Sequence, residues 1–198
     1  MQSGEPHILT KNGRQGPWFT ANNSQSMDMQ APVPNTVCNP VASSFTCFTW
    51  EMNTTGTLVG TNAYAQIGFD LDQVAGVTNP YDAGNDAGTY NGIVFWGQGM
   101  AGLKVHVQFP IPGTVASGGN GGGTCNASTM ICGDSYEVVK PFSPTWTAYS
   151  VSFAELAQEN FGTPVPFTPD AILTIQFQVK IGDGTSAFDY SIGAVGFY

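Results

Sequence analysis

The sequence predicts an all-β protein, a two-sheet antiparallel β-sandwich of the jelly-roll kind, on three observations. Glycine (25) and proline (13) are frequent, which is typical of a chain with many turns. Charged residues make up only 10% of the chain, whereas aromatic residues reach 12%, so long charged helix surfaces are not expected. Short stretches of alternating apolar and polar residues recur between turn-forming residues, which is the pattern of sheet-forming strands.

The strand pattern is clearest in LKVHVQF, where every second residue is apolar and one face of an extended chain can enter the core. ILTIQFQV shows the same alternation, and the other segments combine aromatic and β-branched residues between turns. Between the strands lie two turn-rich loops, 79–90 and 116–133, and the segment 153–162, which holds at most one or two helical turns with Gly162 as a stop. In order, strands are predicted at 16–22, 45–52, 62–71, 91–98, 103–109, 146–153, 172–179 and 188–197.

The length of 198 residues suits one β domain with a sizeable core, and no repeat or linker divides it. We therefore expect a single domain over residues 1–198. The net charge of −9 argues against nucleic acid and against an acidic membrane surface, because five Lys and Arg cannot neutralise many phosphates. No apolar run is long enough to span a membrane.

The four cysteines fall into two close pairs, Cys38 with Cys47 and Cys125 with Cys132. Neither pair has the spacing of a zinc knuckle, so two sequence-local disulfides are favoured over metal ligation or free thiols. A bridge between Cys125 and Cys132 would restrain a glycine-rich loop. Disulfides indicate an oxidising compartment, and since Met1 is not followed by a signal peptide, we expect a segment taken from a longer secreted protein.

The faces of the strands that are turned away from the core carry an unusual set of side chains. A face that only meets water is usually rich in Lys, Glu and Thr, whereas these faces are rich in amides and aromatic rings. The candidates are Tyr64, Gln66, Trp96, Lys104, His106, Gln108, Gln176 and Gln178, with Trp50 as a further aromatic residue.

Amides and aromatic rings together match the chemistry of sugars. An amide offers a donor and an acceptor to hydroxyl groups, and an aromatic ring can stack on the C–H face of a sugar ring. A sheet lined in this way could hold a glycan chain across its strands. The alternative is that each side chain simply faces water, and the pattern alone does not show that the strands are neighbours.

Four stretches of the chain resemble one protein family. YNGIVFWGQGMAGLKVHVQFP (90–110) resembles a Y-x-G-I-x-F-W-A-R-G pattern followed by a V-x-V-x-F strand. GEPHILTKNGRQGPWFTANN (4–23), WTAYSVSFAELAQENFG (146–162) and the closing PDAILTIQFQVKIGDGTSAFDYSIGAVGFY (169–198) are similar to its first, later and last strands. The family is that of the carbohydrate-binding modules of family 11 type (CBM11-like), with a galactose-binding-domain-like jelly roll.

For the ligand, a neutral β-glucan such as cellulose or mixed-linkage glucan is the first choice, because a neutral, amide-lined cleft suits neutral sugars. The resemblance implies a secreted, monomeric, non-catalytic module that targets an attached enzyme to a polysaccharide. It also implies a structural Ca²⁺, for which Glu5 and Asp189 occupy the matching acidic positions. The usual I-D-D is replaced by 192–194 (Ile-Gly-Ala), which removes one or both side-chain ligands, so both carboxylates could instead be ordinary surface residues. The family's arginine is also absent, because 97–98 reads Gly-Gln.

Two alternatives to a glycan-binding module remain. A jelly-roll enzyme is one, either a hydrolase with two carboxylates facing one cleft or a lyase using Lys104, His106 and Tyr64 as acid and base. The predicted polar face contains no glutamate, which disfavours a hydrolase. It also contains no arginine that would neutralise a uronate, which disfavours a lyase. A structural or adhesion module without a glycan ligand is the other alternative. The glutamates considered are Glu5, Glu51, which has no clear partner, Glu137, Glu155 and Glu159.

Overall fold

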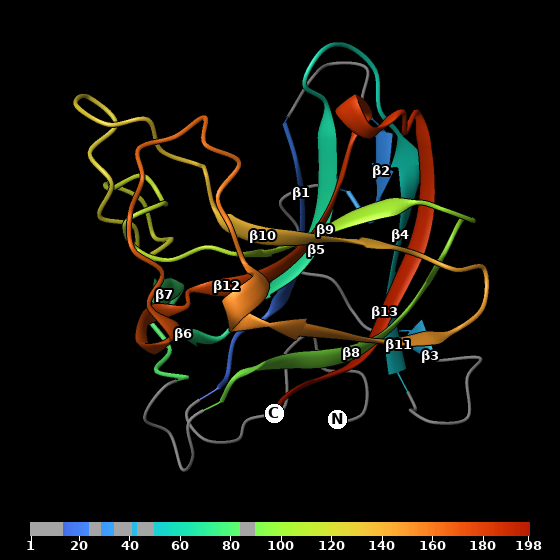
Figure 1. Ribbon diagram of the computed structural model, residues 1–198, viewed down its shortest axis with the longest axis horizontal. Coiled ribbons are helices and arrows are strands. Elements are labelled where there is room, and N and C mark those ends of the chain that lie inside the picture. The colour runs from blue at the N-terminus through green and yellow to red at the C-terminus, as the bar shows by residue number, and fades with distance from the viewer. Residues whose placement is uncertain (1–13, 24–28, 34–40, 43–49, 84–89) are drawn as a thin grey trace.

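The computed structural model describes residues 14–23, 29–33, 41–42, 50–83 and 90–198, and it confirms the predicted antiparallel β-sandwich (Figure 1). The first sheet contains, in spatial order, β1 (Trp18–Asn22), β5 (Tyr64–Asp70), β12 (Thr174–Lys180), β9 (Lys104–Phe109) and β10 (Tyr136–Pro141). The second contains β11 (Thr147–Ser152), β8 (Gly92–Gly99), β13 (Ala187–Phe197), β4 (Trp50–Thr57) and β2 (Met29–Ala31), with β3 (Val41–Ala42) beside β4. A separate hairpin consists of β6 (Asp72–Val74) and β7 (Val77–Asn79).

The core lies between the two sheets, where the apolar residues of the alternating strands meet. Phe95 of β8 and Phe177 of β12 are both fully buried, with their rings edge to face at 5.0 Å. Tyr190 of β13 reaches across the same space, where its hydroxyl donates to the carbonyl of Phe177 at 2.5 Å and accepts from the amide of Ile67 at 3.3 Å. One buried tyrosine therefore ties the six-stranded sheet to the five-stranded sheet.

Each of the eight predicted strand segments contains a strand, although residues 43–49 lie outside the described part of the chain. The prediction missed the short strands β2, β3, β6 and β7, and it missed β10, which proves important for the site. The expected one or two helical turns at 153–162 reduce to one 3-10 turn, η1 (Phe153–Glu155), whose N-terminus is capped by a capping box between Ser152 and Glu155. The other 3-10 turns are η2 (Pro169–Ala171) and η3 (Ile181–Asp183).

Two long connections pack together into a side lobe, defined here as residues 110–135 and 156–168, which projects on the left of Figure 1. The two parts are joined at Ile131 and Thr163 by a backbone hydrogen bond of 3.0 Å and by a side-chain hydrogen bond of 3.0 Å. The predicted Cys125–Cys132 disulfide is present within the lobe. The other predicted pair, Cys38 and Cys47, lies outside the described residues. Across the described residues, no helix has the length and apolar character needed to cross a membrane.

Candidate functional site

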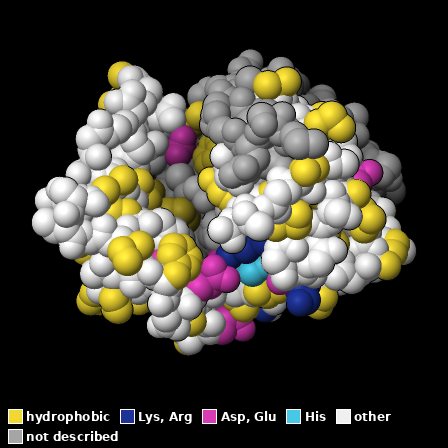
Figure 2. Space-filling model, turned by 90° about the horizontal axis from the view of Figure 1, so that it is seen from above, with side chains coloured by type: hydrophobic (Ala, Val, Ile, Leu, Met, Phe, Trp, Pro, Cys, Tyr) yellow, Lys and Arg dark blue, Asp and Glu magenta, His cyan; other side chains and the backbone are white. Residues whose placement is uncertain are grey.

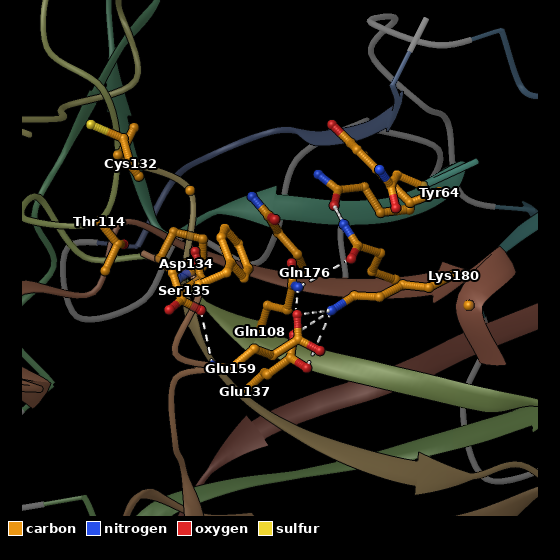
Figure 3. A pocket seen from close by; sticks show the side chains of 18 of the residues that line it. Tyr64, Gln108, Thr114, Cys132, Asp134, Ser135, Glu137, Glu159, Gln176 and Lys180 are labelled. Atoms are coloured by element: carbon orange, nitrogen blue, oxygen red, sulfur yellow. Dashed lines mark hydrogen bonds and ion pairs between the residues drawn. The ribbon is translucent and has the colours of Figure 1, made fainter. Parts of the chain in front are cut away.

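A cleft of about 890 Å³ lies over the face of the five-stranded sheet that is turned away from the core. Its floor is formed by β5, β12, β9 and β10, one wall by the side lobe, and its far end by Asn62–Tyr64 and Gly182. Figure 2 shows the cleft as a hollow between two parts of the molecule, with acidic, basic and histidine side chains gathered at one end. A close view of the lining residues is given in Figure 3.

The floor brings together the glutamines that the sequence pattern had assigned to one face. Gln178 of β12 is paired with Gln66 of β5 on one side and with His106 of β9 on the other, while Gln176 is paired with Gln108. The strands that carry these residues are therefore neighbours, in a register that places all of them on the same face. The amide-lined surface expected from the alternation is present, and it forms the floor of a cleft.

Hydrogen bonds connect the floor amides in series. The Nε2 atom of Gln108 donates to Oε1 of Gln178 at 3.2 Å, and Nε2 of Gln178 donates to Oε1 of Gln66 at 2.8 Å. Gln176, the sheet partner of Gln108, is not part of this series and donates to the hydroxyl of Thr174 at 2.9 Å. All four glutamines line the cleft while these bonds hold their side chains in place.

His106 lies beneath the charged end of the cleft and is only 4% exposed. Its Nδ1 contacts Oε1 of Glu137 at 2.5 Å, and its Nε2 contacts Oδ2 of Asp183 at 2.6 Å. Burial lowers the pKa of His106, but the hydrogen bonds to the two carboxylates and the charge of Glu137 outweigh it, so that its pKa is raised. Because both ring nitrogens are held by protein carboxylates, His106 supports the floor and has no ring nitrogen left for a ligand.

The expectation that no glutamate falls on the polar face is wrong, because β10 adds Glu137 to it. Glu137 is paired with Gln108 in the sheet register and is 8% exposed. Burial raises its pKa, but hydrogen bonds from His106 and Gln108 and the charges of His106 and Lys180 outweigh burial, so the pKa of Glu137 is lowered. The clue in the sequence was YEVV, a short β-branched stretch between the turn at Gly133 and Pro141.

Lys180 joins the carboxylates at this end of the cleft. Its Nζ contacts Oε2 of Glu137 at 3.2 Å and Oε2 of Glu159 at 2.7 Å, and Figure 3 shows its side chain reaching between them. His106, Glu137 and Glu159 also bring three potential metal-ligand atoms within 4.8 Å of one another. A metal ion here would have to displace the Lys180 ammonium, because that group already bridges both carboxylates.

An exposed aromatic ring, Phe161, lies in the wall of the cleft, at a position that the sequence pattern did not indicate. The side chain of Phe161 is 54% exposed. Its loop is held by Asp134, which is 2% exposed and accepts backbone hydrogen bonds from Glu159 and Gly162, both at 2.9 Å. Asn160 in the same loop has a φ of 68°. The ring is thus displayed by a fixed loop, a placement that depends on a contact between segments 25 or more residues apart.

Of two other predicted residues, Tyr64 lines the cleft and Lys104 does not. Tyr64 is half-buried where β5 begins, it lines the cleft, and burial raises the pKa of its hydroxyl. Lys104 begins β9, is exposed, and lies 3.7 Å from a carboxylate oxygen of Asp183.

The remaining predicted residues are not brought to the cleft by the described structure. Trp96 is in β8 of the six-stranded sheet, so it does not join the floor. Trp50 is in β4 of that sheet, and its side chain lies outside the described part. Asp189 is exposed on β13, where Oδ1 accepts from Nδ2 of Asn53 at 3.0 Å, and its expected Ca²⁺ partner Glu5 is outside the described residues. The Ca²⁺ site therefore stays a prediction.

No protein-family model and no curated protein sequence matches the chain. Among solved structures it is similar to a family 11 carbohydrate-binding module from Clostridium thermocellum in complex with a β-1,3-1,4-mixed-linked tetrasaccharide, with a TM-score of 0.58 and 10% identity over 100% of this chain and 96% of that one. It is also similar to a family 30 carbohydrate-binding module of a Clostridium thermocellum cellulosomal cellulase, with a TM-score of 0.61 and 12% identity over 98% and 96% of the two chains. The chain shares the fold of these modules over its whole length.

Proposed function

We propose that this chain is a non-catalytic carbohydrate-binding module that holds a neutral polysaccharide in the cleft over its five-stranded sheet. One observation carries the proposal: amides of Gln66, Gln178 and Gln108, from three adjacent strands, line a cleft whose wall displays the exposed ring of Phe161. The amides suit sugar hydroxyls, and the ring suits the C–H face of a sugar. The fold shared with carbohydrate-binding modules supports the same conclusion.

The charge of the cleft favours a neutral ligand over a uronic acid polymer. Glu137, Glu159 and the buried Asp134 outnumber Lys180 among the lining residues, and the whole chain carries a net charge of −9. A uronate would therefore be repelled at close range and over longer distances. We take a neutral β-glucan as the first choice, since the family 11 module similar in fold was solved with a mixed-linkage β-glucan fragment.

The proposed binding residues are the tyrosine and glutamines of the sequence prediction that line the cleft, together with Phe161 and Lys180, which the sequence pattern did not indicate. His106 and Glu137 act beneath them as supports, and Trp96 lies outside this site because it belongs to the other sheet. The proposed ligand contacts are Tyr64, Gln66, Gln108, Gln176, Gln178, Lys180 and Phe161.

A glycoside hydrolase is the second candidate, favoured by two carboxylates that line the cleft, Glu137 and Glu159. Oxygen atoms of Glu137 and Glu159 lie within 4.8 Å of each other. A hydrolase needs one carboxyl group protonated as a general acid. Both groups are instead paired with Lys180, and hydrogen bonds from His106 and Gln108 together with nearby cations outweigh burial and lower the pKa of Glu137. We therefore place binding ahead of hydrolysis.

The proposal extends to the setting of the module. We propose a secreted monomer, one domain over its whole length, attached to a catalytic or other domain, as the disulfide and the fold suggest. The structural Ca²⁺ at Glu5 and Asp189 is retained as part of this proposal. Thermal melts with Ca²⁺ and with a chelator test it, and a gain in melting temperature that Asp189→Asn abolishes is expected.

Binding to a panel of immobilised β-glucans, xylan, mannan and pectin tests the main proposal, by affinity gel and by calorimetry. Retention by at least one neutral glycan, and none by pectin, is the expected result. A folded protein that binds no glycan would sink the proposal. Release of reducing ends or of unsaturated products from the same panel would favour an enzyme instead.

A further inference from the structure

The series of hydrogen bonds along the cleft floor begins at a carboxylate, and from Gln108 onward each glutamine donates to the next. Nε2 of Gln108 donates both to Oε2 of Glu137, at 2.7 Å, and to Oε1 of Gln178. Nε2 of Gln178 then donates to Oε1 of Gln66. Figure 3 shows Glu137 and Gln108 side by side at one end of this series. We call the three glutamines Gln66, Gln108 and Gln178 the amide relay.

A row of amides has no preferred direction of its own. Each amide has an oxygen that accepts and an NH₂ group that donates. If all three amides were turned over, so that oxygen and nitrogen exchanged places, the hydrogen bonds between the glutamines would still form with donor and acceptor reversed. An ionised carboxylate only accepts, so it discriminates between these two arrangements. Glu137 requires the NH₂ of Gln108, and the orientations of Gln178 and Gln66 then follow in turn.

The charges around Glu137 maintain this discrimination. His106 and Lys180 both contact its carboxylate, and they lie on β9 and β12, the strands that carry Gln108 and Gln178. The cations stabilise the ionised, accept-only form of Glu137 inside a nearly buried site. The charges of His106 and Lys180 therefore act on the glutamines through Glu137, which accepts the hydrogen bond from Gln108.

We propose that Glu137 is a positioning residue for glycan recognition, because its carboxylate sets the direction of the amide relay and hence which polar atoms the floor offers to a sugar. Gln108 then presents its Oε1 acceptor and Gln66 its Nε2 donor, two strands apart, on the order of 10 Å. A bound chain must donate a hydroxyl hydrogen bond at the Gln108 end and accept one at the Gln66 end. This inference rests on the proposed function and adds a fixed direction to the ligand.

The test compares Glu137→Gln with Asp183→Asn in calorimetric titrations with the glycan that the wild-type panel identifies. Glutamine at 137 can turn either end to Gln108, so the relay loses its direction, and affinity falls about tenfold. Asp183→Asn removes the same charge from the other side of His106 without touching the relay, and it changes affinity less than about twofold. Equal losses in the two variants, or no loss in Glu137→Gln, would overturn the inference.

A double-mutant cycle separates positioning from general damage. Glu137 and Gln66 lie at opposite ends of the relay, with two glutamines between them. If Glu137 orients Gln66, then Gln66→Leu weakens binding about tenfold in the wild type and only about twofold in Glu137→Gln. The same cycle with Asp183→Asn is additive under the proposal, and additivity in both cycles contradicts it.

Separate control experiments distinguish a folding defect, a failure of the proposed function and a failure of this inference. If Glu137→Gln alone fails to fold, the charge-balanced pair Glu137→Gln with Lys180→Met replaces it, compared with Lys180→Met alone. A wild-type protein that is folded yet binds no glycan would overturn the proposed function and this inference together. A wild type that binds, with Glu137→Gln unchanged, overturns only the role of Glu137.

Discussion

Gly162 lies against Asp134 so closely that no side chain fits between them. A Cβ at position 162 would lie 2.3 Å from the Cβ of Asp134, while the Gly162 amide donates to Oδ2 of Asp134 at 2.9 Å. The other carboxylate oxygen accepts from Glu159. The segment that displays Phe161 is therefore held against the other segment of the side lobe by one buried carboxylate and one glycine.

Replacing Gly162 should displace the loop that carries Phe161 and leave the β-sandwich intact. Gly162→Ala forces the loop away from Asp134, so we expect the free energy of unfolding to fall by about 1–3 kcal/mol and glycan affinity to fall several-fold. Urea denaturation and calorimetric titration measure the two effects. Gly119→Ala, in the same lobe with open space around it, is the matched control. Wild-type affinity in Gly162→Ala would show that the loop position does not matter for the ligand.

Removing the aromatic ring should cost affinity without costing stability. Phe161→Ala deletes a stacking surface that is mostly exposed in the free protein, so we expect a five- to tenfold loss of affinity and an unchanged melting temperature. Phe161→Tyr should retain binding. Ile131→Ala removes an equally exposed apolar side chain from the same lobe outside the cleft lining, and it serves as the control. Equal affinities for Phe161→Ala and the wild type would exclude a stacking role.

His106→Ala should act mainly on stability, because the imidazole lies between Glu137 and Asp183. Losing the shared cation leaves two carboxylates facing an empty space, at a cost of about 3 kcal/mol near pH 6. The pKa of His106 is raised by folding, so its contribution is complete below its unfolded value of about 6.5 and is lost as the pH rises through the folded pKa. Urea titrations at pH 6 and pH 9 should therefore show the larger loss at pH 6, and a pH-independent loss would contradict this origin.

Replacing Asp70, in contrast to replacing His106, should stabilise the protein at neutral pH. Burial raises its pKa from 3.8 to about 6, although hydrogen bonds from Thr78 and Gln73 oppose the rise. Its protonated form favours folding below about pH 4, and this contribution is lost as the pH rises through about 6. Asp70→Asn should thus be more stable than the wild type at pH 7, by up to about 3 kcal/mol. Urea titrations at pH 4 and 7 test this, with Asp72→Asn as the control; a variant less stable than wild type at pH 7 would contradict it.

The alternating pattern was sufficient to predict the floor of the cleft. Because side chains alternate with a period of two, the apolar residues of β9 and β12 assign Gln108 and Gln178 to one face before the strand order is known. The same argument could not place Trp96, since alternation assigns a side chain to a face of its own strand but not to a sheet. Sheet membership is set by pairing between segments far apart in the sequence.

The charged end and the wall needed tertiary contacts that no local pattern contains. Glu137 was missed because β10 (YEVVKP) follows a turn-rich loop and does not keep the alternation of apolar and polar residues, so its strand signal is weak. Phe161 was missed because its segment resembles the end of a helix, with Gly162 in the place of a helix stop. In the structure that glycine instead allows close packing against Asp134, a contact across 28 residues.

The cleft has a floor formed by strands of the sandwich and a wall formed by the loops of the side lobe. The floor is built from strands whose opposite faces form the core, so a substitution there has to satisfy both the ligand and the sandwich. The lobe contributes no strand to either sheet. Its two segments are joined at Ile131 and Thr163, and the Cys125–Cys132 disulfide restrains the first of them. Insertions or exchanges in 116–131 could therefore reshape one side of the cleft while the core stays as it is. Ligand specificity in this fold can therefore change through substitutions in the loops with little effect on the stability of the sandwich.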